Sequence, residues 1–61
     1  MKINRDLAID RFEGLTGIYL EQYPDDYQLV QLLRIACRAN YDGHEGFERF
    51  DEAMKEIVIN D

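Results

Sequence analysis

Apolar residues recur every three or four positions along this chain, and the pattern is clearest in its last third. Over residues 45–58, one side of a helix would carry the apolar side chains of Phe47, Phe50, Met54 and Ile57. Three glutamates spaced by four residues would lie on the opposite side, namely Glu48, Glu52 and Glu56. A pattern with this period predicts an amphipathic helix that buries one stripe and exposes an acidic face.

Residues 26–39 are predicted to form the most apolar helix of the chain. Its inner side carries Leu29, Leu32, Leu33, Ala36 and Cys37, and its polar side is narrow. Pro24 and the two aspartates that follow it favour a helix start, since proline suits the first turn and acids suit the positive end of the helix dipole. We expect this helix at the centre of the domain, packed against the apolar side of 45–58.

Residues 4–22 are predicted to form a helix with an unusually wide apolar side. Its centre is defined by Ala8, Phe12, Leu15 and Tyr19. Four further residues widen it, Leu7 and Ile18 on one flank and Ile9 and Leu20 on the other. One neighbouring helix cannot cover so wide a surface, so these four flanking residues are candidates for contact with a second copy of the chain.

Gly14 and Gly17 leave two alternatives open for this first helix. Each glycine weakens a helix by about 1 kcal/mol relative to alanine, and the first alternative is therefore a kinked or broken helix. The second is a continuous helix whose glycines form a smooth strip where another backbone comes close.

The breaks at residues 23–26 and 40–46 divide the chain into these segments, because proline, asparagine and Asp-Gly pairs end helices. The fold class predicted is all-α, a small three-helix bundle or an orthogonal helical array, in one domain over 1–61. A chain of 61 residues buries only about 60% of the surface that its unfolded form exposes and is marginally stable alone. Its one cysteine cannot form an internal disulfide, so association with further copies is the remaining reinforcement.

The charge of the chain argues against several kinds of partner. Thirteen acids oppose seven bases, and the net charge is −6. This balance disfavours direct binding to nucleic acids and to anionic membranes. The last helix would be the recognition helix of a helix-turn-helix protein, and its acids would repel phosphates. We expect no apolar leader and no membrane-spanning run of about 20 residues, and hence a soluble cytoplasmic protein.

The residues needed for catalysis and metal binding are scarce. The chain has no serine, one threonine, one cysteine and one histidine. Nucleophilic catalysis needs a nucleophile with a base to activate it, and a structural zinc site needs four ligands. Cys37 is expected in the core and His44 in a solvated turn. The sequence therefore predicts no enzyme activity, no metal site and no cofactor.

Two surfaces are candidates for binding a protein partner. Tyr27, Arg34 and Arg38 share the polar side of their helix, and an exposed tyrosine with arginines is typical of binding hot spots. Glu48, Glu52 and Glu56 would form a straight row at about 6 Å per step. Such a row can imitate the phosphates of a nucleic acid.

In size and composition the chain resembles small acidic helical accessory proteins of phages, plasmids and bacteria. The leading hypothesis is a non-enzymatic protein-binding module that self-associates and modulates a larger cytosolic partner. The first alternative is an inhibitor that mimics nucleic acid and blocks a DNA- or RNA-binding protein. The second is a small oligomeric regulator associated with DNA.

Overall fold

The computed structural model describes residues 2–22 and 24–59, and its regular structure there is helical. The elements in chain order are α1 (Arg5–Thr16), α2 (Asp26–Asn40) and α3 (His44–Ile57). No strand occurs in these residues, and an isolated antiparallel bridge joins Ile3 to Val58. The predicted all-α, three-helix fold is confirmed.

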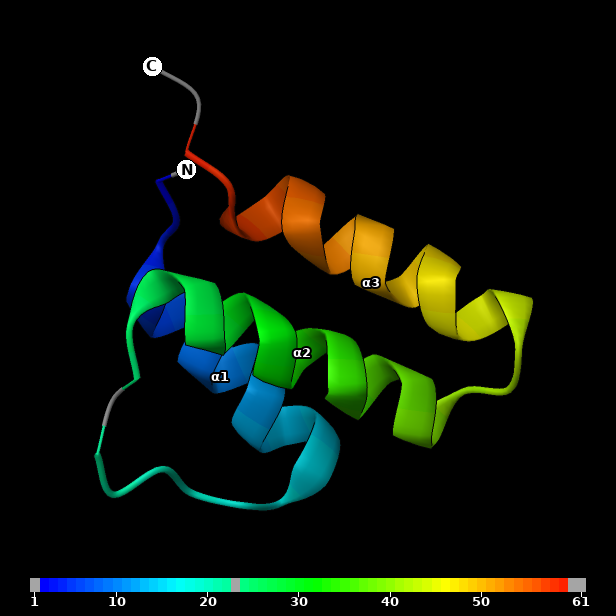
Figure 1. Cartoon of the computed structure of the whole chain (residues 1–61), viewed down its shortest axis with the longest axis horizontal. Helices are drawn as coiled ribbons and strands as arrows, with labels where there is room; N and C mark the ends of the chain where they lie inside the picture. The colour runs from blue at the N-terminus through cyan, green and yellow to red at the C-terminus, as the bar shows by residue number, and fades with distance from the viewer. Residues whose placement is uncertain (1, 23, 60–61) are drawn as a thin grey trace.

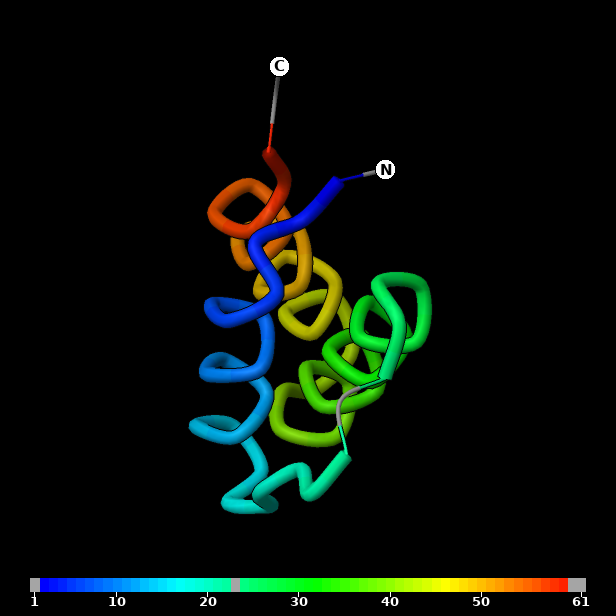
Figure 2. Tube along the Cα trace, turned by 90° about the vertical axis from the view of Figure 1, so that its left-hand side faces the viewer, coloured from blue at the N-terminus to red at the C-terminus, as the bar shows by residue number. Residues whose placement is uncertain are grey.

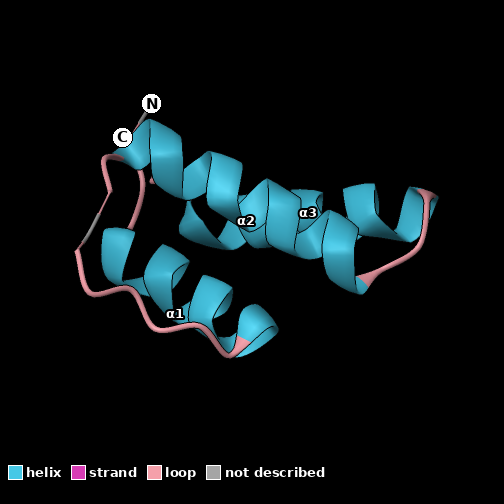
Figure 3. Ribbon diagram, turned by 60° about the horizontal axis from the view of Figure 1, so that its bottom comes forward, coloured by secondary structure: helices cyan, strands magenta, loops and turns pink. Residues whose placement is uncertain are grey.

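Each helix contacts the other two. α3 runs antiparallel to α2, whereas α1 runs in roughly the same direction as α2 (Figure 1). The connection after α1 must therefore return along the length of α1 before α2 begins, as Figure 3 shows. The molecule is flat, with extents of 30 × 29 × 15 Å.

The predicted helix over 4–22 is wrong for residues 17–22, because α1 ends at Thr16. Gly17 adopts a left-handed conformation with a φ of 70°, and its N–H donates to the carbonyl of Glu13 at 2.8 Å. This is a glycine C-cap, which L side chains adopt only with strain. Of the two alternatives for the glycines, the break is the observed one, and it lies at Gly17, whereas Gly14 is helical.

The return connection is held against α1 by the side chains of Glu13 and Thr16. The N–H of Leu20 donates to Oε2 of Glu13 at 3.0 Å. Thr16 accepts from the N–H of Ile18 at 3.1 Å and donates to the carbonyl of Phe12 at 2.9 Å. Residues 18 and 20 thus belong to a loop with its own hydrogen bonds and not to a helical face.

The start of α2 agrees with the sequence prediction. Asp25 accepts from the N–H of Gln28 at 2.8 Å, and the Gln28 side chain accepts from the Asp25 N–H, which completes a capping box. Arg5 donates to the carboxylate of Asp26 and to the carbonyl of Pro24. These contacts fasten the first turn of α2 to the first residue of α1.

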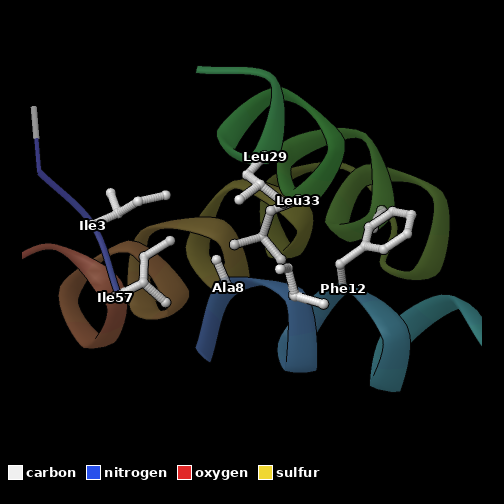
Figure 4. Close-up of a cluster of buried hydrophobic side chains, with 8 residues drawn as sticks. Ile3, Ala8, Phe12, Leu29, Leu33 and Ile57 are labelled. Carbon is white, nitrogen blue, oxygen red and sulfur yellow. The ribbon is translucent and has the colours of Figure 1, made fainter. Parts of the chain in front are cut away.

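The core lies between the three helices and includes residues before α1 (Figure 4). Its buried apolar members are Ile3, Ala8, Ile9, Phe12, Leu29, Leu33, Ala36 and Ile57. Leu33 and Ile57 are 0% exposed. The predicted packing of α3 is correct for Ile57, but Phe50 and Met54 are only half-buried and Phe47 is exposed. Leu32, predicted on the inner side of α2, is also half-buried.

The two described ends of the chain lie side by side, as Figure 2 shows. The N–H of Asn4 donates to the carbonyl of Ile57 at 2.7 Å, and the N–H of Ile59 donates to the carbonyl of Lys2 at 2.9 Å. This pairing brings Ile3 over the end of α3 and closes the core there. None of the described helices has both the length and the apolar character needed to cross a bilayer.

Candidate protein-binding surfaces

The outer side of α2 exposes large apolar side chains to solvent. Tyr27 is 71% exposed and Ile35 is 62% exposed. Gln31 lies one helical turn from each, so the three share a face. A shallow hollow of about 280 Å³ follows this face. Its lining residues, which we call the α2 surface, are Pro24, Tyr27, Gln28, Gln31, Leu32 and Ile35.

Two arginines extend the α2 surface toward the C-terminal end of the helix. Arg34 and Arg38 are both exposed, so the structure places them with Tyr27 on the solvent side of α2. The guanidinium carbon of Arg38 lies 5.5 Å from the ring centroid of Phe47 on α3. This cation–π contact brings the guanidinium group of Arg38 over α3.

Ile35 is an exposed apolar residue of this surface that was not predicted as a candidate from the sequence. It lies four residues after Gln31 and eight after Tyr27, and thus on the polar side of the helix. An aliphatic residue on the polar side is an exception to the amphipathic pattern. This exception could have identified Ile35 as a candidate binding residue. It is hard to recognise in the sequence, because apolar residues are frequent throughout this helix.

The acidic row on α3 is exposed, but it is interrupted by basic side chains of the same chain. Oε2 of Glu56 accepts a hydrogen bond from Nε of Arg11 at 3.0 Å and forms an ion pair with its Nη2 at 2.8 Å. Nε2 of His44 lies 3.7 Å from Glu48, a contact that is ionic only when the imidazole is protonated. Arg49, next to the row, lies 3.5 Å from Glu45 and 4.9 Å from the ring centroid of Tyr41. The α3 surface therefore has mixed charge.

The predicted self-association residues do not form one surface. Ile9 is 7% exposed and belongs to the core of its own chain. Leu7 and Leu20 are half-buried against that core. Ile18 is 57% exposed, but it lies in the loop after Gly17. The predicted wide apolar side required a helix that continues to residue 22. Because α1 ends at Thr16, Ile18 and Leu20 are not on the same helix as Leu7 and Ile9.

The structure gives Cys37 and His44 different environments. Cys37 is 1% exposed, and burial raises the pKa of its thiol because the thiolate would lose its hydration. A buried thiol with a raised pKa is a poor nucleophile. His44 is the exposed first residue of α3. Within residues 2–22 and 24–59, no three acidic, histidine or cysteine side chains gather into a group able to hold a metal ion.

Comparison of the chain with models of known protein families, with curated proteins and with solved structures found no significant match.

Proposed function

We propose that this chain is a non-enzymatic protein-binding module that self-associates, acts in the cytoplasm and modulates a larger protein partner. The observation that best supports the proposal is the α2 surface. Tyr27 and Ile35 remain exposed there beside a hollow, although the same helix supplies Leu29 and Leu33 to the core.

The chemistry of the α2 surface suits a protein partner. Contiguous exposed apolar groups rimmed by polar side chains mark surfaces that bind other proteins. Tyrosine and arginine contribute more binding energy than most residues at such surfaces, and Tyr27 lies on the same face as Arg34 and Arg38. A complementary surface would offer aliphatic side chains for Tyr27 and Ile35, with acidic groups opposite the arginines.

A nucleic-acid-mimicking inhibitor, of the kind that phages use against host factors, is the second candidate function. Its supporting observation is that Glu48 and Glu52 are exposed one turn apart on α3. The pairing of Glu56 with Arg11 and the position of Arg49 beside the row lower the negative potential that mimicry needs. We therefore rank nucleic-acid mimicry below protein binding through the α2 surface.

Affinity capture with surface variants distinguishes the two functions. Tagged wild-type protein would be incubated with an extract of its native host, and the captured proteins would be identified by mass spectrometry. Binding through the α2 surface predicts that Tyr27→Ala combined with Arg34→Ala reduces capture of the main partner at least about tenfold, as loss of two hot-spot side chains does. The double change Glu48→Lys and Glu52→Lys is the matched control and should leave capture unchanged.

Mimicry predicts the reverse result. The double lysine variant would then lose its partner, and capture by the wild-type protein would fall steeply with salt. Glu56 is left intact in this variant, because its substitution would also release Arg11 from α1. Retention of the partner by both double variants would contradict both proposals.

A further inference from the structure

The residues along the outer side of α2 are arranged symmetrically about Gln31. Tyr27 lies four residues before Gln31, and Ile35 lies four residues after it. Asp25, which is exposed, lies at the N-terminal end of the helix, whereas Arg34 and Arg38 lie in its C-terminal half. A helix with this arrangement is complementary to a reversed copy of itself.

We propose that the α2 surface binds the α2 surface of a second copy of this chain, with the two helices antiparallel and crossing at Gln31. This inference rests on the proposed function, because it names one protein that the module binds. Residues equally far from Gln31 in opposite directions lie at the same level in such a pair. Tyr27 of each copy therefore lies at the level of Ile35 of the other, and the pair forms two apolar contacts related by a two-fold axis.

The charges select the antiparallel orientation. Arg38 of one copy lies at the level of Pro24 of the other, beside the exposed carboxylate of Asp25. A parallel pair would instead place each arginine beside the same arginine of the other copy, which is unfavourable. The antiparallel orientation also sets the positive end of each helix dipole beside the negative end of the other.

The symmetry limits the assembly to a dimer, because a two-fold contact uses the same surface on both copies and closes. α2 has 15 residues and is about 22 Å long at 1.5 Å per residue. One helix of this length covers less than the roughly 800 Å² that each partner buries in a standard interface. We therefore expect a weak dimer that forms in the micromolar to millimolar range.

Sedimentation equilibrium from about 10 µM to about 1 mM, a range that covers weak association, tests the dimer. The apparent mass of the wild-type chain should rise from 7.2 kDa toward twice that value. Ile35→Asp should stay monomeric at every concentration, because a charge would be buried in the apolar contact with Tyr27 of the other copy. Ile35 is exposed in the monomer, so the variant should fold normally. The circular dichroism spectrum of Ile35→Asp should therefore match that of the wild type.

Ile18→Asp is the matched control for Ile35→Asp. Ile18 is 57% exposed and Ile35 is 62% exposed, so the two substitutions change a similar surface side chain in the same way. Ile18 lies in the loop after α1 and does not line the hollow of the α2 surface. The Ile18→Asp variant should dimerise like the wild type, and its failure to do so would contradict the assignment of the contact to α2.

Gln28→Glu tests the orientation. In the antiparallel pair Gln28 lies at the level of Arg34 of the other copy, so the new carboxylate should lower the dimer dissociation constant severalfold. In a parallel pair the two substituted side chains would face each other and raise that constant. The cap of α2 should persist, because glutamate replaces glutamine in a capping box.

The failure of this inference can be told apart from failure of the proposed function. A wild-type chain that remains monomeric to about 1 mM, or an Ile35→Asp variant that still dimerises, overturns the α2–α2 contact. If the monomeric wild type still captures a different protein and Tyr27→Ala with Arg34→Ala abolishes that capture, the occupant of the α2 surface is that protein. The protein-binding part of the proposed function then stands, whereas its self-association is overturned together with this inference.

Discussion

At the scale of single residues, Gly46 is the glycine with the least space for a side chain. A Cβ atom there would lie 3.2 Å from the carbonyl oxygen of Tyr41, 3.3 Å from Cα of Arg38 and 3.4 Å from the carbonyl oxygen of Cys37. All three are backbone atoms, so no flexible side chain can move aside. The close approach of α3 to the end of α2 therefore depends on the missing side chain.

Gly46→Ala and Gly14→Ala are expected to change stability in opposite directions. Alanine gains up to about 1 kcal/mol over glycine in a helix, but overpacking costs about 1–3 kcal/mol, so Gly46→Ala should lower the free energy of unfolding. At Gly14 a Cβ would meet nothing within 4 Å, and this variant should gain about 0.5–1 kcal/mol. Urea unfolding of both variants measures the difference, and a stabilised Gly46→Ala variant would show that the helices can separate without cost.

Cys37 should make stability depend on pH in the alkaline range. Burial raises the pKa of its thiol, so the unfolded chain loses this proton at a lower pH than the folded chain. Its contribution to stability is complete below the thiol pKa of the unfolded chain and is lost as the pH rises through the higher pKa of the folded state. The slope cannot exceed about 1.4 kcal/mol per pH unit.

Urea unfolding at stepped pH, compared between the wild type and Cys37→Ala, isolates the contribution of the thiol. The wild type should lose stability faster than the variant above the ordinary thiol pKa. All other side chains are the same in the two proteins, so their contributions cancel in the comparison. Parallel profiles would mean that Cys37 is not buried in solution.

At the scale of the helices, the end of α1 differs most from the sequence prediction. Residues 17–22 have helical apolar spacing, but Gly17 closes the helix and Glu13 holds the N–H of Leu20. α3 shows a smaller difference, since its apolar stripe is deepest at Ile57 and shallowest at Phe47. The apolar stripe of α3 is correctly predicted. How deeply each of its residues is buried depends on how far α1 and α2 extend beside it.

Gly17→Ala should destabilise the protein by about 1 kcal/mol, because a non-glycine residue is strained in the left-handed conformation. Gly17→Asn is the matched variant. It should lose less stability than Gly17→Ala, since asparagine tolerates this conformation. Thermal unfolding followed by circular dichroism ranks the three proteins. If Gly17→Ala proved the most stable and more helical, residues 17–22 could continue α1 after all.

At the scale of the whole molecule, contacts between distant parts of the chain hold a thin structure together. Arg5 binds the first turn of α2, and Arg11 binds Glu56 of α3. The backbone pairing of residues 2–4 with 57–59 brings Ile3 into the core at 5% exposure. With a shortest extent of 15 Å, the molecule has little interior, so each buried residue contributes a large share of stability.

Ile3→Ala should therefore cost about 2 kcal/mol or more, the usual result of truncating a buried isoleucine. Ile59→Ala is the control, because Ile59 lies in the same terminal pairing but is 41% exposed. Ile59→Ala should lower the free energy of unfolding by less than about 1 kcal/mol, as expected for partly exposed positions. Equal effects in urea unfolding would mean that the terminal segment is not packed against the core.

The sequence by itself determined the all-α fold, the existence of the helices and the near-correct bounds of α2 and α3. These properties depend on local signals: periodic apolar residues, the Asp25 capping box and the Asp-Gly turn before α3. The sequence also placed Tyr27, Arg34 and Arg38 on one side of a helix, because a single helix fixes the relative directions of its own side chains.

Tertiary structure decided which apolar residues are buried and which remain for a partner. Ile9 and Ile35 are equally apolar, yet Ile9 is covered by its own chain and Ile35 is exposed, because only the packing of the helices determines which sides face inward. The end of α1 before Gly17 takes residues 17–22 out of the predicted helical face, and Arg11 offsets the charge of Glu56 on α3. Periodicity describes one helix at a time, whereas these outcomes depend on residues that are distant in sequence and adjacent in space.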